Sequence, residues 1–448
     1  MNDLLKKYNV PGPRYTSYPT VPYWDSKNFS KNKWNQNVVD TFNISNQDGI
    51  SLYIHLPYCE SLCTYCGCNT RITVNHTVEE PYVNAVLKEW QMYLVKFPAK
   101  PKIKEIHLGG GTPTFFSEKN LERLIQGILE KSEICSDFEF GFEGHPNYTS
   151  KNQLQKLYDL GFRRLSLGVQ DFDPVVQNII NRIQSFETVK EISEQASAIG
   201  YDSINYDLIY GLPMQTLNSI SDTINKVIEL RPDRIAFYSY AHIPWLKKGQ
   251  RKFTEHDLPN GEDKLRLYET GRTMLENAGY KEIGMDHFAL KSDSLYKSSM
   301  NKKLHRNFMG YTTSETKLLI GLGVSSISDS WVAFAQNVKT VEEYLRLISE
   351  GNLPVFKGHI LSGEDLIIRQ HILNLMCNFE TSWSEQHSVI NKGISRMTEL
   401  VNDGLVVFEN NKITITEKGR PFVRNVCMAL DECLYKDTAQ TQKFSTVV

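Results

Sequence analysis

The sequence predicts an α/β fold: a partial (β/α)6 TIM-like barrel with an N-terminal extension and a mostly helical, winged-helix-like C-terminal domain. From residue 50 onward, apolar runs of strand length alternate six times with longer helical patterns. That order is typical of βαβ units in a parallel sheet, and six units instead of eight favour an open barrel. Five of the six strand candidates also carry apolar side chains on one face and small or polar ones on the other. This alternation indicates an interior cavity rather than a sealed core.

The strands and helices of this predicted barrel follow one another in chain order. The predicted strands are 51–56, 103–108, 137–143, 163–169, 203–209 and 234–240. The predicted helices are 78–96, 117–131, 151–160, 186–199 and 216–230, with 262–278 after the last strand.

The polar strand faces lead to candidate ligand-binding residues. Glu143, Gln170 and Asp207 stand at the carboxyl ends of three predicted strands, which is where barrels hold their ligands. An exposed face of an antiparallel sheet would alternate in the same way. The helical patterns between the strands favour the barrel.

The chain divides into an extension at 1–49, the barrel at 50–354 and a C-terminal helical domain at 355–448. We expect the extension to be irregular, because residues 12–19 are rich in turn formers. In the last region a helix at 388–403, strands at 405–408 and 412–416, and a helix beginning near Glu417 form a winged-helix-like pattern. Since no basic stripe accompanies it, a structural or lid domain without nucleic acid is the favoured interpretation.

Composition excludes several classes of partner. Hydrophobic residues make up 40% of the chain, charged residues 23%, and the formal net charge is -2, so no global attraction to nucleic acid or acidic membranes follows. The first residues are polar and lack the apolar core of a signal peptide. No stretch approaches the roughly 20 apolar residues of a membrane span. We therefore expect a cytoplasmic protein. The oligomeric state leaves no signal in the sequence, and a monomer is the default expectation.

Four of the eight cysteines crowd between residues 59 and 68. Cys59, Cys63 and Cys66 form a C-x3-C-x2-C motif directly after the first predicted strand. Three thiolates on one short loop can hold an iron–sulfur cluster and leave one iron open, with Cys68 as a possible fourth ligand. A zinc site would need a second pair of ligands, and no second C-x2-C occurs; redox-active thiols are the other alternative.

A glycine-rich loop, Gly109-Gly110-Gly111-Thr112-Pro113, follows the second predicted strand. Glycines let a backbone approach a ligand closely. Such a loop is weak evidence alone, but its place beside the cysteine loop makes it a candidate cofactor-binding element.

The cysteine motif, with an aromatic residue before its last cysteine, and the GGGTP loop together resemble the radical S-adenosylmethionine superfamily. The likeness narrows to the oxygen-independent coproporphyrinogen III oxidase (coproporphyrinogen dehydrogenase) family and covers nearly the whole chain. The motifs that carry it are GPRYTSYP at 12–19, CGCN at 66–69, GVQDF at 168–172, DLIYGLP at 207–213, GMDHF at 284–288, HRNF at 305–308 and RNVCM at 424–428.

This resemblance implies a [4Fe–4S] cluster on Cys59, Cys63 and Cys66, with Cys68 outside the ligand set, and two molecules of S-adenosylmethionine. The first would bind at Tyr53, Gly110, Glu143 and Ile327, and the second at Tyr65, Gly111, Thr112, Gln170, Arg182, Asp207 and Ala241. Elementary chemistry supports several of these roles, because Glu143 can accept from an amine, Asp207 from a ribose hydroxyl, and Arg182 can clamp a carboxylate.

The resemblance also implies an oxidoreductase of haem and porphyrin biosynthesis. Members of the family convert two propionates of coproporphyrinogen III to vinyl groups through a 5′-deoxyadenosyl radical, giving protoporphyrinogen IX without O₂. A reductant and an electron acceptor are required. Arg14 and Arg306 are hypothetical anchors for the substrate carboxylates.

Two other functions are open to a chain with these motifs: a haem-degrading methyltransferase of the same superfamily, and a haem chaperone that kept the cluster. Cys66-Gly67-Cys68 and the N-terminal extension favour the oxidase. Two positions depart from the family pattern: Gly144-His145-Pro146 follows Glu143 where an acidic residue and Pro are expected, and Met309 stands in place of Gln. Both bear on binding of the second cofactor.

Overall fold

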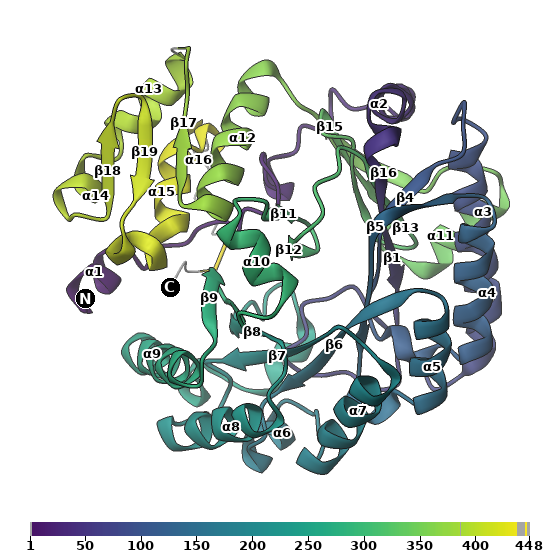
Figure 1. The fold of residues 1–448 in the computed structure, drawn as a ribbon, viewed down its shortest axis with the longest axis horizontal. Coiled ribbons are helices and arrows are strands. Elements are labelled where there is room, and N and C mark those ends of the chain that lie inside the picture. The colour runs from purple at the N-terminus through teal and green to yellow at the C-terminus, as the bar shows by residue number, and fades with distance from the viewer. Residues whose placement is uncertain (1, 386, 437–443, 446–448) are drawn as a thin grey trace.

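A 12-stranded mixed sheet organises the computed structural model, which describes residues 2–385, 387–436 and 444–445 (Figure 1). Its strand order is β16-β15-β14-β13-β1-β4-β5-β6-β7-β8-β10-β9. All six predicted strands are present, pair in chain order and run parallel. They are β1 (Ile50–Leu56), β4 (Lys102–Gly110), β5 (Glu133–Gly144), β6 (Phe162–Gln170), β7 (Ser203–Tyr210) and β8 (Arg234–Ser239).

The six predicted helices are also confirmed, and those that connect the parallel strands lie along the outer side of the sheet (Figure 1). They are α3 (Glu79–Leu94), α4 (Glu118–Leu129), α5 (Lys151–Asp159), α7 (Phe186–Ile199), α8 (Leu217–Leu230) and α9 (Gly261–Asn277). In α4, buried Leu121, Leu124, Ile125 and Ile128 recur at helical spacing and form the stripe that faces the sheet. No helix of the described ranges combines the length and apolar character that crossing a membrane requires.

Strand β6 confirms the predicted alternation of its two faces. Leu165, Leu167 and Val169 are at most 1% exposed and belong to the main apolar core. Ser166 and Gly168 point the other way and line cavities. The sheet therefore packs its apolar side on the helices and leaves a polar interior.

Several strands at the two edges of the sheet are additions that the sequence analysis missed. Beyond β1 lie β13 (Leu319–Leu322), β14 (Ile327–Asp329), β15 (Ala333–Asn337) and β16 (Val355–Ile360); beyond β8 lie β10 (His287–Ala289) and β9 (Lys281–Gly284). β16 pairs with β15, so the large sheet includes residues 355–360. The shorter elements α10 (Ser294–Met300), α11 (Val341–Ser349) and the hairpin β11 (His305–Asn307) with β12 (Gly310–Thr312) connect these parts, and α6 (Pro174–Ile179) lies between β6 and α7.

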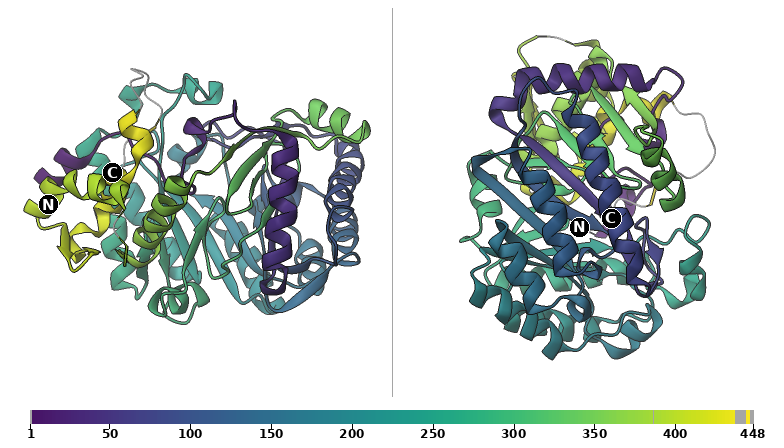
Figure 2. Two further views of the ribbon diagram at one scale, coloured as in Figure 1. Left: turned by 90° about the horizontal axis from the view of Figure 1, so that it is seen from above. Right: turned by 90° about the vertical axis from the view of Figure 1, so that its right-hand side faces the viewer.

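The expectation of an irregular N-terminal extension was wrong. It contains α1 (Asn2–Tyr8) and a 15-residue helix, α2 (Lys31–Ser45). Ser30 caps α2, and Trp34, Val38 and Phe42 bury one side of the helix in the main core beside β15 (Figure 2). Their spacing of four residues is helical, but the polar residues between them hid the pattern.

The C-terminal region forms its own apolar cluster from α12 (Gly363–Asn378), α15 (Val423–Leu430) and the elements between them. The predicted hairpin is present as β18 (Val406–Glu409) and β19 (Lys412–Ile415), and β17 (Glu380–Ser382) adds a third strand. The single predicted helix 388–403 is instead α13 (Ser388–Ser395) and α14 (Thr398–Asn402). Between them the amides of Arg396 and Met397 bond carbonyls three residues back instead of four, which interrupts the helix. A short helix, α16 (Glu432–Lys436), follows α15.

Candidate active site

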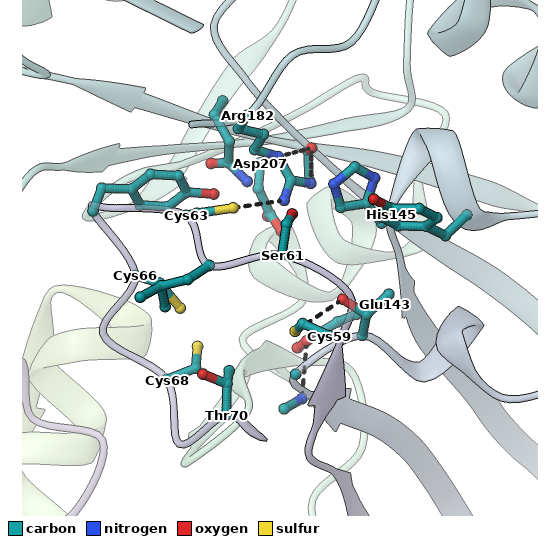
Figure 3. Close-up of a pocket in the computed structure, with 18 of the residues that line it drawn as sticks. Cys59, Ser61, Cys63, Cys66, Cys68, Thr70, Glu143, His145, Arg182 and Asp207 are labelled. Atoms are coloured by element: carbon teal, nitrogen blue, oxygen red, sulfur yellow. Dashed lines mark hydrogen bonds between the residues drawn. The ribbon is translucent and has the colours of Figure 1, made fainter. Parts of the chain in front are cut away.

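A cavity of about 300 Å³ opens where the carboxyl ends of the parallel strands meet the cysteine loop (Figure 3). We call it the cofactor cavity. Eleven of the fourteen predicted site residues line it: Cys59, Cys63, Tyr65, Cys66, Gly110, Gly111, Thr112, Glu143, Gln170, Arg182 and Asp207. Tyr53, Ala241 and Ile327 do not.

The cysteine loop is fixed at both its ends and its middle. At its base β2 (Tyr58–Cys59) pairs in parallel with β3 (Arg71–Ile72). Thr64 bonds the carbonyls of Ile179 and Ile180 at the end of α6, at 3.0 and 2.9 Å. On the other side the Lys247 ammonium donates to the Cys68 carbonyl at 3.0 Å. The loop is thus held in shape by neighbours from three parts of the chain.

Each of the three predicted ligand thiols has a hydrogen-bond donor. The Thr112 hydroxyl lies 3.2 Å from the Cys59 sulfur, and the Arg182 guanidinium donates to the Cys63 sulfur at 3.6 Å. A hydrogen bond from Cys68 lowers the pKa of Cys66 to about 6. Burial raises the pKa of Cys59 to about 11.

The donor set fits an iron–sulfur cluster better than a single metal ion. All eight cysteines are free thiols. Within the described residues, no three His, Cys, Asp or Glu side chains gather closely enough to hold one ion. In a cuboidal cluster each thiolate binds its own iron, so thiols spread around a cavity are what it needs.

The glycine loop packs directly on the cysteine loop and the end of β1. The Gly111 and Thr112 amides donate to the carbonyls of Leu56 and Tyr58 at 2.9 and 3.0 Å. A Cβ at Gly110, whose φ is +117°, would stand 2.6 Å from the His55 ring, and one at Gly111 would stand 2.5 Å from the Pro57 backbone. Only glycine allows this close approach.

Glu143, at the end of β5, is held as an acceptor. It accepts from the Gly110 amide at 3.2 Å and from His107 at 3.3 Å. Burial opposes ionisation of Glu143, but its hydrogen bond and electrostatic interaction with His107, together with the bond from the Gly110 amide, hold its pKa below the ordinary value. An ionised carboxylate at this place can bind the amine of a ligand.

Asp207, on β7, is a second acceptor within the same cavity. It accepts from the Ser166 hydroxyl at 3.1 Å and from the Asn205 amide at 2.9 Å, and burial raises its pKa to about 6. Arg182 donates to the Gly168 carbonyl as well as to the Cys63 sulfur, so it connects the end of β6 to the cysteine loop (Figure 3).

The three predicted residues outside the lining have other neighbours. The Tyr53 hydroxyl is 3.1 Å from His55, and its ring stacks on His107. The Ala241 carbonyl accepts from Gln250, which also bonds the Tyr65 carbonyl. Ile327, on β14, packs in a small apolar cluster with Trp24 and Phe334.

Both departures from the family pattern line cavities. His145 lines the cofactor cavity, and burial lowers its pKa to about 2, so it is neutral there. Met309 lines an adjacent cavity, which we call the inner cavity. The two cavities share Glu143, Asp207 and Tyr238.

The sequence analysis missed the residues that position the predicted ones. His107 fixes Glu143, and Ser166 with Asn205 fixes Asp207. Their signal was the period-two alternation, which places all three on the polar strand faces. The alternation predicted on which face of the sheet each side chain lies, but it could not predict the hydrogen bonds between neighbouring strands.

Comparisons with known proteins give the relatives of this chain. The Radical SAM superfamily profile matches residues 53–227. Oxygen-independent coproporphyrinogen III oxidase from Helicobacter pylori (strain ATCC 700392 / 26695) is 39% identical over 441 residues, covering 96% of each chain. Its namesake from Escherichia coli (strain K12) is 37% identical over 453 residues, covering 99% of this chain and 98% of that protein. The solved structure of coproporphyrinogen III oxidase from Escherichia coli, described as a radical SAM enzyme, matches with a TM-score of 0.90 at 35% identity, covering 96% of this chain and 98% of that one.

Proposed function

This chain belongs to the family of oxygen-independent coproporphyrinogen III oxidases, and from that premise we propose that it converts two propionates of coproporphyrinogen III to vinyl groups. The product is protoporphyrinogen IX, and no O₂ is used. The observation that carries the proposal is the cofactor cavity, where three free thiols face acceptors on three strand ends.

A [4Fe–4S] cluster and S-adenosylmethionine are the cofactors of this superfamily, and together they supply the radical chemistry that removes a hydrogen atom from the substrate. We propose Cys59, Cys63 and Cys66 as the cluster ligands, with Cys68 outside the set. The support is that all three line one cavity and that each has a donor for a thiolate.

Two S-adenosylmethionine molecules are proposed to bind in and beside the cavity. Tyr53, Gly110, Glu143 and Ile327 serve the first, and Tyr65, Gly111, Thr112, Gln170, Arg182, Asp207 and Ala241 serve the second. Glu143 accepts from the amine of the first, Asp207 accepts from the ribose of the second, and Arg182 neutralises a carboxylate. Six of these positions lie within two residues of the carboxyl end of a parallel strand, where this fold gathers ligands: Gly110, Gly111, Thr112, Glu143, Gln170 and Ala241.

The finer architecture is part of the proposal. Six consecutive parallel strands support a partial (β/α)6 barrel, and the hairpin with its third strand supports a winged-helix-like C-terminal domain. Each propionate loses a hydrogen atom, CO₂ and one electron, so a reductant for the cluster and an electron acceptor are required. We propose a monomer that works in the cytoplasm, where thiols such as these eight stay reduced.

An anaerobic assay tests the function. The reconstituted protein is supplied with coproporphyrinogen III, S-adenosylmethionine and a reductant, and products are followed by mass spectrometry. Successive loss of two CO₂, with 5′-deoxyadenosine and methionine, is the expected result. Cleavage of S-adenosylmethionine without decarboxylation would replace the proposal with the haem-degrading methyltransferase. An intact cluster without cleavage would replace it with the chaperone.

A further inference from the structure

Cationic side chains from four separate segments gather near one another. They are Arg14 of the N-terminal segment, Lys264 of α9, Arg306 of β11 and Arg424 of α15, and we call them the cationic cluster. Arg14 and Arg424 lower the pKa of Lys264, and Arg14 and Arg306 lower the pKa of Arg424. The four cations therefore lie within electrostatic reach of one another. Asp286 joins them through an ion pair with Arg14 at 3.2 Å.

Arg306 is the most unusual member of the cluster. Its side chain is buried, with 8% of the residue exposed. One guanidinium nitrogen donates to the Arg14 carbonyl at 3.3 Å, but Nε and Nη1 have no hydrogen-bond partner among the described residues. A buried guanidinium with two unused donors is costly unless an anion completes it.

Lys264 likewise meets a neutral acceptor. Its ammonium donates to the Tyr240 carbonyl at 2.9 Å. Burial, together with repulsion from Arg14 and Arg424, lowers its pKa to about 8. Burial and repulsion from Arg14 also lower the pKa of Arg424 to about 10. Positive charge is therefore concentrated here under strain that an anionic ligand would relieve.

Two members of the cluster, Arg14 and Arg306, lie one side chain away from these cavities, whereas Arg424 and Lys264 line two other cavities. The Arg14 guanidinium stands 5.8 Å from the centre of the Tyr238 ring, and Tyr238 lines the cofactor cavity and the inner cavity. The Arg306 guanidinium stands 4.5 Å from the centre of the Tyr311 ring, which lines the inner cavity.

We propose that the cationic cluster binds the carboxylates of the two propionates that the tetrapyrrole keeps. This inference rests on the proposed function, which gives the substrate four carboxylates and consumes two. The reacting propionates must approach the cofactor cavity, so the retained pair needs cations on the opposite side of the macrocycle. Two guanidinium groups suit this task, because each can bind a carboxylate in bidentate fashion.

Binding of fluorescent porphyrins to the cluster-loaded protein under anaerobic conditions tests the site. Coproporphyrin III carries all four propionates, whereas mesoporphyrin IX carries only the retained pair. Arg14→Gln and Arg306→Gln should each weaken binding of both probes by about tenfold, since each removes a charged hydrogen bond. Arg306→Lys keeps the charge and should lose less. Arg346→Gln is the control, because Arg346 pairs with Glu350 on the exposed surface of α11.

Iron content and circular dichroism confirm that each variant is folded, and the partly exposed Arg14 keeps the test valid if Arg306→Gln does not fold. Unchanged affinity for both probes would overturn the proposal. A loss for coproporphyrin III alone would also overturn it, because it would assign the cluster to the reacting propionates. So would a loss of S-adenosylmethionine binding without a loss of porphyrin binding. If the wild type binds both probes but releases no CO₂, the proposed function fails while the variants still decide the site.

Discussion

At the scale of single residues, the environments of the three proposed ligand thiols differ. Cys59 has a neutral hydroxyl donor, Cys63 a guanidinium, and Cys66 a second thiol. Hydrogen bonds to the sulfurs and local charge set the reduction potential of an iron–sulfur cluster. The chain can therefore tune its cluster through residues that are not ligands.

Thr112→Val removes the donor to Cys59 while keeping the side-chain shape. Without that bond the more negative, reduced cluster is less stabilised, so the midpoint potential should become more negative. A redox titration followed by electron paramagnetic resonance, without S-adenosylmethionine, measures it. Ser61→Ala, on the same loop and lining the same cavity, is the control. Equal potentials for Thr112→Val and wild type would contradict a role for the hydroxyl.

Cys68→Ser tests whether Cys68 is a cluster ligand or only a hydrogen-bond donor to Cys66. If Cys68 only donates to Cys66, the variant should keep nearly all of its iron and sulfide after anaerobic reconstitution, because a serine hydroxyl can still donate. Cys63→Ser should lose most of both. Cys135→Ser, remote from the cavity, controls for general handling of thiols. Loss of iron from Cys68→Ser equal to that from Cys63→Ser would place Cys68 among the ligands.

At this scale the sequence predicted functional residues that lie inside motifs, but it could not predict contacts between distant segments. The cysteine spacing, the glycine loop and the polar strand ends led to nine residues of the cavity lining, and the family resemblance added Tyr65 and Arg182. By contrast, Arg14 and Arg306 were singled out separately, and nothing in the sequence places them in contact across 292 positions. Lys264 stands in no motif, and Arg424 was noted only as the first residue of the RNVCM motif, because the sequence does not show which charges the fold brings together.

At the scale of elements, Glu89 of α3 joins four segments. Its carboxylate accepts from the Gly323 amide after β13, the Asn337 side chain on β15 and the Tyr344 hydroxyl on α11, at 2.8, 2.7 and 2.6 Å. The side chain is 0% exposed. Burial outweighs these three donors and raises its pKa to about 7.

Glu89 should make the edge of the sheet sensitive to pH. Between its ordinary pKa of 4.5 and the folded value of about 7, the folded state holds a proton that the unfolded state releases. Stability from this group is therefore present at low pH and is lost as pH rises, by up to about 3 kcal/mol. Between pH 5.5 and 8, the free energy of unfolding measured by urea titration should fall less in Glu89→Gln than in wild type.

A matched substitution at an exposed glutamate checks that assignment. Glu350 forms an ion pair on the surface of α11, so Glu350→Gln should follow the wild-type pH dependence. The same slope in Glu89→Gln and wild type would show that other buried carboxyls account for the change.

The two-residue repeat of strands and the 3.6-residue repeat of helices explain why some elements could be predicted and others could not. The six parallel strands each carry enough alternating positions to be read, and their helices bury regular stripes. β10 and β14 have only three residues each and persist because neighbours pair with them. α2 was missed because three buried aromatic or aliphatic residues stand among twelve others that are mostly polar.

At the scale of the whole molecule, the N-terminal segment connects the large sheet to the C-terminal region. Tyr8 donates to Asp403 at 2.6 Å, and the Tyr15 hydroxyl donates to Asp431 at 3.0 Å. The neighbouring Arg14 instead reaches the large sheet, donating to the Ser239 carbonyl at 3.1 Å. Figure 1 shows α1 lying against the C-terminal elements. No sequence pattern predicts these contacts between the N-terminal segment and the C-terminal region, because they depend on tertiary packing alone.

Tyr15→Phe should loosen the support of Arg14 without touching the cofactors. Losing one buried hydrogen bond costs about 1 kcal/mol, and the freed segment would present Arg14 to the substrate less often. We expect a severalfold rise in KM for coproporphyrinogen III, with kcat and iron content unchanged, and faster proteolysis within residues 1–20. Tyr201→Phe loses a comparable buried bond, to the Leu154 carbonyl at 2.9 Å, far from the cationic cluster. If KM rises equally in both variants, the rise comes from a general loss of stability, and the N-terminal segment does not position Arg14. If KM rises only in Tyr15→Phe, the packing of the N-terminal segment on the C-terminal region sets the affinity for substrate.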